Sequence, residues 1–111
     1  ISEKIKKLSI KDGSQIHIID VDDILFIQAN GDYVDIHSES GKYIKEHTMK
    51  ELENSLPENF IRIHRSYIVN IYKISRAELF GKESYNIYLK KGACIRASAT
   101  GYKQLKNKLS I

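Results

Sequence analysis

The chain has 111 residues, of which 41% are hydrophobic and 29% are charged, and its net charge is +4. This length fits one domain with one hydrophobic core, and the composition is typical of a folded globular protein rather than a disordered one. No apolar run approaches the roughly 18 residues of a membrane span and no signal-peptide pattern is present, so no membrane partner is expected.

The first residues predict a β-hairpin followed by a central strand. Residues 5–10 and 15–19 alternate weakly between apolar and polar on either side of Asp12-Gly13, which is a strong hairpin signal. Residues 24–27 form a continuous apolar run. Such a run is typical of a strand that is covered on both faces.

Two further strands are predicted before residue 47. A turn at Asn30-Gly31-Asp32 precedes the alternating run 33–37, because Asn and Gly tolerate positive φ. Ser40-Gly41 then turns the chain into a strand over residues 42–46. His37 falls at a polar position of its run, and we expect its side chain to face solvent.

The period changes from strand to helix at Thr48. Thr48 and Glu51 have the spacing of a capping box, which satisfies free N–H groups at a helix start. Apolar residues then recur at helical spacing until Pro57 ends the pattern. A helix of about eight residues is too short to be stable alone, so we expect it to pack on the sheet.

The stretch from Phe60 to Asn70 predicts strand, exposed bend, strand. Residues 60–63 alternate, then three polar residues, His64-Arg65-Ser66, break the period before an apolar run resumes at Tyr67. A polar tip that is held at both ends by core residues is suited to present a reading or catalytic group.

The remainder predicts more strands and a C-terminal helix or turn. Residues 85–89 alternate, 90–92 form a turn, and 94–98 form the returning strand, in which Cys94 is expected to fill core space. Residues 101–109 have helical apolar spacing and a basic outer face. In the mixed segment 71–79 before this hairpin, we expect Tyr72, Ile74 and Leu79 to contact the core.

The predicted fold class is therefore mainly β. We expect about ten short, mostly antiparallel strands in small sheets, one short helix after the first half, and a short C-terminal helix or turn. The chain starts at Ile1 and has no initiator Met, from which we expect a domain of a longer protein. Cys94 is the only cysteine, so a reducing compartment, the cytoplasm, is expected.

Catalysis is not indicated. The four histidines do not form an HxxxH or HExxH spacing, and a single cysteine cannot build a Cys-based zinc site. His64 and Ser66 lack an oriented third partner for nucleophilic chemistry. We therefore expect a protein that is not an enzyme and holds no cofactor and no metal.

Several stretches together resemble the LytTR family, the LytR/AlgR-type DNA-binding domains of bacterial response regulators. Residues 25–34 resemble its I-x-Y-I-E-A-x-x-N-Y-V stretch, and residues 48–57 resemble its helix segment. Residues 60–70 closely resemble its F-x-R-I-H-R-S-Y-I-V-N signature, and Ser98 with Tyr102 resembles its C-terminal S-R-x-Y region. The order and spacing cover nearly the whole chain.

The resemblance implies a fold of about ten strands in three small sheets. It implies transcription regulation by sequence-specific binding of double-stranded DNA through three loops, two of them in successive major grooves. It also implies that residues 1–111 form one LytTR-type output domain of a two-component phosphorelay regulator. A receiver domain would then lie N-terminal to this chain, and dimers would bind paired direct repeats.

Carried over by position, the resemblance places the loops at residues 30–33, 64–66 and 99–101, with Arg65 at a base-contacting position. Relatives commonly carry Arg just after Ser98, whereas this chain has Ala99 and Thr100. Either this loop reads a different base or Lys103 takes over as a phosphate contact. The candidate DNA-binding residues are Asn30, Asp32, Tyr33, Arg62, His64, Arg65, Ser66, Thr100 and Lys103.

The side chains themselves indicate different roles. Arg65 on a rigid bend can bond guanine bidentately, with an ordinary surface ion pair as the alternative. Arg62 can pair with a phosphate or a carboxylate, and His64 can donate to DNA or brace the bend. Asn70 is expected to cap a turn. Asp32 would repel phosphates, although it can accept from cytosine N4.

The charge distribution favours a polyanion partner. Residues 1–58 hold seven Lys and Arg against twelve Asp and Glu, whereas residues 59–111 hold eleven against two, which gives −5 and +9. A solvated surface is the ordinary alternative. A protein-interaction module that docks a partner or receiver domain is the second hypothesis. A single-stranded RNA binder is a third, but Tyr85 and Tyr88, its aromatic candidates, fall at core-like positions.

Overall fold

The computed structural model of the chain describes residues 4–82 and 84–110. Over these ranges the backbone forms ten strands, two α-helices and two single-turn 3-10 helices. The strands are β1 (Lys7–Asp12), β2 (Gln15–Asp20), β3 (Ile24–Asn30), β4 (Tyr33–Ser38), β5 (Gly41–Glu46), β6 (Phe60–His64), β7 (Tyr67–Asn70), β8 (Ile74–Phe80), β9 (Ser84–Leu89) and β10 (Cys94–Ala97). The helices are η1 (Val21–Asp23), α1 (Met49–Ser55), η2 (Ile71–Lys73) and α2 (Ala99–Leu109).

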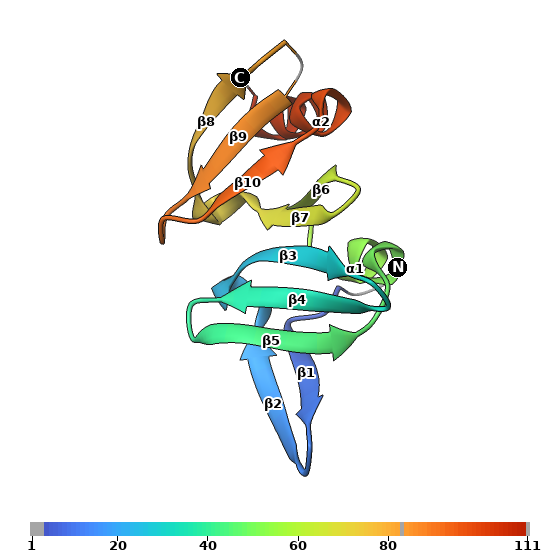
Figure 1. Cartoon of the computed structure of the whole chain (residues 1–111). Helices are drawn as coiled ribbons and strands as arrows, with labels where there is room; N and C mark the ends of the chain where they lie inside the picture. Colours follow the sequence, from blue (N-terminus) through green and yellow to red (C-terminus); the bar gives the residue numbers. More distant parts are fainter. Residues whose placement is uncertain (1–3, 83, 111) are drawn as a thin grey trace.

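Three small antiparallel sheets contain these strands, as the sequence predicted (Figure 1). The central sheet has the strand order β5-β4-β3-β7-β6, the third sheet has the order β10-β9-β8, and β1 pairs with β2 alone. In Figure 1 the β1–β2 hairpin lies below the central sheet, and the third sheet lies above it with α2. The fold is therefore mainly β, with a short helix after the first half and a C-terminal helix.

One face of the central sheet is covered by α1 and the β1–β2 hairpin. Ile27, Val34 and Ile36 of the sheet pack with Leu52 of α1 and Ile10 of β1, and each of these side chains is at most 1% exposed. Fully burying one such side chain contributes about 1.5–3 kcal/mol relative to leaving it in water. This burial stabilises a helix that is too short to form alone.

The start of α1 has the predicted capping box. The Thr48 hydroxyl oxygen accepts from the Glu51 N–H at 3.1 Å, and the Thr48 N–H donates to Glu51 Oε1 at 3.2 Å. The Thr48 hydroxyl also donates to Glu51 Oε1 at 2.8 Å, and this bond, together with the one from the Thr48 N–H, lowers the pKa of the Glu51 carboxyl. The reciprocal pair satisfies two N–H groups that the first helical turn leaves without partners.

A second core joins the central sheet to the C-terminal elements. Ile63 of β6 and Val69 of β7 pack with Ile87 of β9 and Leu105 of α2, and none of these side chains is more than 1% exposed. The two cores lie on opposite faces of the central sheet: Ile27 and Ile68 face the first core, whereas Phe26 and Val69, their neighbours in β3 and β7, face the second.

Three residues expected inside the protein are exposed. Tyr72 is 67% exposed because it lies in the 3-10 turn η2 rather than in a strand, and Leu79 is 58% exposed on the edge strand β8. Cys94 is exposed because Ile95 and Ala97 occupy the buried face of β10, and a period of two turns Cys94 outward.

His37 also differs from its prediction, since it is half-buried rather than solvent-facing. Its ring stacks on Phe26, the cross-strand neighbour on β3, with the centroids 4.2 Å apart. Burial lowers the pKa of His37, and the nearby Lys42 ammonium lowers it further. The alternating pattern predicts an exposed side chain at this position, but the ring of Phe26 covers this part of the sheet face.

Candidate nucleic-acid interface

The three loops that the sequence singled out lie on the same side of the molecule. The β3–β4 turn, the β6–β7 bend and the β10–α2 junction all lie at the right in Figure 1. Backbone hydrogen bonds connect them: the Ala29 N–H donates to the Ser66 carbonyl at 2.8 Å, and the Ser98 N–H donates to the Ile63 carbonyl at 2.9 Å. The strands thus hold the bend in register with the loop on either side.

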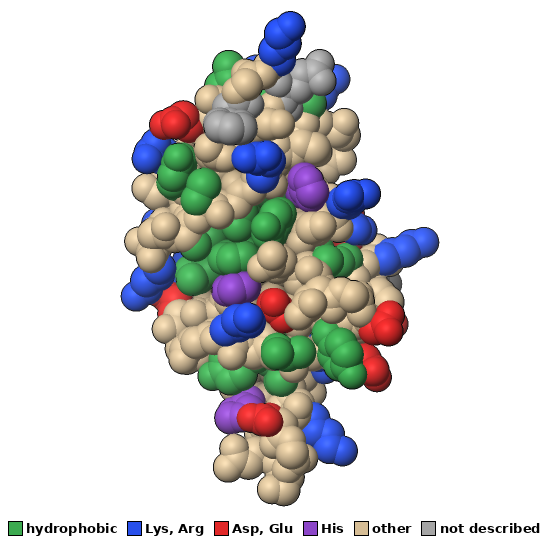
Figure 2. All heavy atoms as spheres, in the orientation of Figure 1, with side chains coloured by type: hydrophobic (Ala, Val, Ile, Leu, Met, Phe, Trp, Pro, Cys, Tyr) green, Lys and Arg blue, Asp and Glu red, His purple; other side chains and the backbone are tan. Residues whose placement is uncertain are grey.

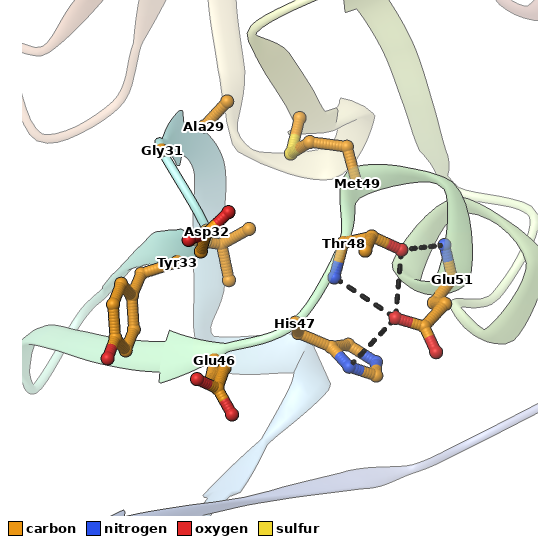
Figure 3. A pocket seen from close by; sticks show the side chains of 10 residues that line it. Ala29, Gly31, Asp32, Tyr33, Glu46, His47, Thr48, Met49 and Glu51 are labelled. Carbon is orange, nitrogen blue, oxygen red and sulfur yellow. Dashed lines mark hydrogen bonds and ion pairs between the residues drawn. The ribbon is translucent and has the colours of Figure 1, made fainter.

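The first loop is a tight turn with an acidic neighbour. Gly31 adopts φ 63°, a left-handed conformation that glycine reaches without steric cost. Tyr33 is 47% exposed, and the Asn30 amide donates to Asp35 Oδ1 at 3.2 Å. Asp32 lines a cavity between this turn and the start of α1 (Figure 3).

The carboxylates around this cavity give that end of the surface a negative character. The cavity has a volume of about 540 Å³, and Glu46 and Glu51 line it together with Asp32. Figure 3 shows the Glu51 carboxylate directed to Thr48 and His47, whose Nδ1 lies 3.6 Å from it. Glu51 is therefore engaged in the helix cap, and Asp32 remains exposed at the loop.

The second loop is the bend between β6 and β7. The pairing of β6 with β7 shifts register between Arg62 and His64, which is the feature that allows three polar residues in succession. Arg65 is exposed at the tip, whereas Ser66 and Tyr67 are half-buried. Tyr67 packs against the second core and anchors the bend.

Two neighbouring side chains brace this bend. Arg62 Nη2 donates to the Arg65 carbonyl at 2.8 Å, and Arg62 Nη1 lies 3.3 Å from Glu53 Oε1 of α1. On the other side, His64 Nδ1 accepts from the Ser66 N–H at 3.1 Å. Within the free domain Arg62 therefore pairs with a carboxylate, and His64 braces the bend.

The third loop is the start of α2, which sits unusually close to β6. A Cβ on Gly101 would lie 1.8 Å from the Ile63 carbonyl oxygen, so only glycine fits there. The Ser98 hydroxyl accepts from the Gly101 N–H at 3.0 Å and caps the helix. Thr100 and Lys103 are exposed on the first turns of α2.

Part of the predicted set meets around one small cavity. Arg62, His64, Arg65 and Thr100 line a space of about 210 Å³ between the bend and α2. Gln104 lines it too and was missed, although its i, i+4 spacing from Thr100 places both on one helix face. The first-loop residues Asn30, Asp32 and Tyr33 do not line this cavity.

Charge on this side is mostly positive beyond the first loop. Figure 2 shows that most Lys and Arg side chains of the visible face lie over its upper half, around the third sheet and the bend. Arg96 of β10 lines a cavity with His64. It is not among the predicted site residues, because a strand with Cys94 inside would also turn Arg96 inward. Burial, Arg65 and Arg96 together lower the pKa of His64.

Asn70 has the structural role that the sequence indicated. Its side-chain oxygen accepts from the Tyr72 N–H at 3.1 Å and from the Asn59 amide at 2.9 Å. Its amide nitrogen donates to the buried Ile24 carbonyl at 2.9 Å. Asn70 thus ties β7, β3 and the turn η2 together rather than facing a ligand.

No helix in residues 4–82 and 84–110 is long and apolar enough to cross a membrane. Within the same ranges, no group of three or more His, Cys, Asp or Glu side chains could hold a metal ion.

Comparisons with known proteins agree with this geometry. The family model of the LytTr DNA-binding domain matches residues 14–110. The sensory transduction protein LytT of Bacillus subtilis is 33% identical over 106 residues, which cover 95% of this chain and 44% of that protein. An uncharacterized HTH-type transcriptional regulator of Staphylococcus aureus is 35% identical over 97 residues, covering 87% of this chain and 66% of that protein.

A solved structure has the same fold. A LytTr DNA-binding domain from Bacillus cereus superposes with a TM-score of 0.88 at 18% identity, covering 96% of this chain and 99% of that one. The present chain spans less than half the length of the LytT protein that it matches. With nearly its whole length matched by the family model, the chain belongs to the LytTR family of DNA-binding domains.

Proposed function

We propose that this domain binds double-stranded DNA sequence-specifically through its three loops, with two of them in successive major grooves. The observation that carries the proposal is the exposure of Arg65 on a bend whose backbone is held by Arg62 and His64. A guanidinium on a fixed support can bond guanine O6 and N7 bidentately, which is the commonest specific contact in the major groove. A mobile arginine would lose part of that energy in ordering.

The other loop residues divide into reading and anchoring roles. Thr100 lines the same small cavity as Arg65, and we assign it a contact with a base or a phosphate. Lys103 is exposed one turn further along α2 and suits a phosphate contact, which sets affinity and register rather than sequence. Asn30, Tyr33 and Ser66 remain candidates at the edges of the surface.

Asp32 is the one anionic side chain in this set. A carboxylate at a DNA surface repels phosphates unless it accepts from cytosine N4. We assign it to the boundary of the footprint, where the carboxylates of the neighbouring cavity also lie.

The wider architecture is part of the same proposal. We infer that residues 1–111 act as the output domain of a longer regulator, because the matched LytT protein is about twice as long as this chain. Binding as a dimer to paired direct repeats, under control of an N-terminal receiver domain, would fit such a regulator. Non-enzymatic action through DNA contacts alone completes the proposal.

The decisive experiment starts from duplexes selected from a random pool by the wild-type chain. Replacing Arg65 with Ala is expected to weaken binding to the selected duplex by about 1–3 kcal/mol and to relax its sequence preference. Competition with a scrambled duplex measures the preference. Lys11→Ala, at an exposed position on the distant β1–β2 hairpin, is the matched charge control. An unchanged specificity ratio in Arg65→Ala refutes the role of Arg65.

Lys103→Ala provides the second arm of this experiment. Because a phosphate contact is independent of sequence, its loss is expected to weaken binding to all duplexes about equally. The slope of log affinity against log salt should fall by about one. A selective loss on the selected duplex instead would make Lys103 a base contact.

A protein-interaction module is the second candidate function. It is favoured by the free face of the β1–β2 hairpin, where Ile16 and Ile18 are 65% and 59% exposed. This function predicts no duplex binding at low salt and a tight protein partner in co-purification.

A further inference from the structure

The hydrogen bond inside the β6–β7 bend defines the protonation state of His64. The Ser66 N–H donates to His64 Nδ1 at 3.1 Å, so Nδ1 must present a lone pair and the ring must be neutral with its proton on Nε2. A protonated imidazolium has an N–H at both nitrogens and cannot accept this bond. The closed form of the bend therefore requires neutral His64.

We propose that His64 is a positioning residue for base reading: its neutral ring closes the bend and aims Arg65, and protonation of the ring opens the bend. This inference rests on the proposed function. The bend has two braces on the backbone around Arg65, and only the one at His64 depends on a proton. The other is the bond from Arg62 to the Arg65 carbonyl.

The groups that face His64 favour its neutral form. Arg65 of the bend and Arg96 of β10 are cationic, and both lower the pKa of His64 after the larger effect of burial. The Tyr67 ring of β7 lies 5.7 Å from the His64 ring, and Cys94 of β10 lines the cavity beside it. The cavity between the bend and α2 is also lined by Glu53 of α1, whose negative charge is engaged by Arg62 in an ion pair.

The direction of the pH effect separates this role from a direct DNA contact. If His64 bound a phosphate as a cation, binding would tighten as the pH falls and the ring gains its proton. As an acceptor that closes the bend, His64 must lose its function on protonation, so specific binding weakens as the pH falls through the pKa of His64, which burial holds below the ordinary 6.5. The two roles therefore predict opposite slopes.

Two substitutions isolate the acceptor from the titration. An Asn side-chain oxygen can accept from the backbone N–H two residues later, as in an Asx turn, and it does not titrate near neutral pH. His64→Asn thus keeps the acceptor and removes the proton switch, whereas His64→Ala removes both. Circular dichroism verifies that each variant is folded at both pH values.

The experiment measures the affinities for the selected duplex and its scrambled version by fluorescence anisotropy at pH 7.5 and pH 5.5, at constant ionic strength. The wild-type ratio of the two affinities is expected to fall about 3- to 10-fold at the lower pH, the effect of one hydrogen bond. The His64→Asn ratio should stay within about twofold at both pH values. His64→Ala should have the low ratio at both.

Each contrary result has a distinct meaning. A wild-type ratio that rises in acid, or a His64→Ala ratio equal to that of the wild type, overturns the positioning role and leaves the proposed function standing. A His64→Asn variant with the same pH slope as the wild type overturns it as well. A wild-type protein that does not distinguish the two duplexes at pH 7.5 refutes the proposed function itself. If His64→Ala is unfolded, the wild type and His64→Asn still decide between the outcomes.

Discussion

The two sides of the central sheet are covered by different elements. On the side of α1 and the β1–β2 hairpin, apolar side chains such as Leu52 are buried. Directed contacts add to burial at two places: Gly101 approaches Ile63 closely on the side of α2, and Asn70, which stands opposite Phe60 on the side of α1, ties β7 to β3 and η2 by hydrogen bonds. Both contacts fall on β6 and β7, the strands that lead into the bend, which suits a surface that must match another molecule.

The largest effect is expected from one leucine on each side. Leu52→Ala and Leu105→Ala each remove a side chain that is at most 1% exposed, and each should lower the free energy of unfolding by roughly 3–4 kcal/mol. Urea titration followed by circular dichroism measures both. Because one sheet links the two cores, each variant should unfold in a single transition. Two separate transitions would show that the two cores unfold independently, so that the two sides of the sheet would not form one cooperative unit.

Asn70→Ala tests the directed contacts. The substitution leaves the Ile24 carbonyl, the Tyr72 N–H and the Asn59 amide without their partner, so we expect a loss of roughly 2–3 kcal/mol. The same urea titration applies, with the exposed Asn107→Ala as the control. A loss no larger than that of the control would mean that these bonds contribute little to the stability of the fold.

Gly101→Ala sharpens the contrast between burial and close approach. Alanine is the better helix former, yet its Cβ would meet the Ile63 carbonyl, so we expect a net loss of roughly 2 kcal/mol. The displaced start of α2 should also reduce the preference for the selected duplex. Asn107→Ala, exposed on the same helix and away from the cavity between the bend and α2, controls for helix propensity. A stabilised variant would show that α2 can move away without cost.

The smallest effect is expected at the cap of α1. Thr48→Ala removes the hydroxyl that accepts from the Glu51 N–H and should cost roughly 1 kcal/mol, whereas Thr48→Ser should be close to neutral. Duplex binding should be unchanged in both variants, since the cap belongs to the other side of the sheet. Altered binding in Thr48→Ala would extend the reading surface to α1.

Local signals in the sequence predicted the elements well. The Asp12-Gly13 turn, the Thr48 cap and the polar triplet 64–66 each depend on residues that are close in the chain, so the residues alone carry the information. The family resemblance added the number of sheets and the set of loops. The turn, the cap and the polar triplet are the features in which local preference and the final fold agree.

What the sequence could not supply is which side of an element becomes covered. A strand has two faces related by a period of two, and only tertiary contacts decide that Ile95 turns inward and Cys94 outward. The Arg62–Glu53 pair and the contact of Gly101 with Ile63 join residues that are distant in the chain. No local pattern reports such distances.

The strand order of the central sheet has a consequence for folding kinetics. Among the described strands, every pairing joins neighbours along the chain except β3 with β7, where Phe26 lies opposite Val69. Closing this long intervening segment carries an entropic cost before any contact compensates it, so the hairpins are expected to form early and the β3–β7 union late. Because the β3–β7 pairing also holds the bend in place, we expect the ability to bind DNA to be acquired only in the slowest step of folding.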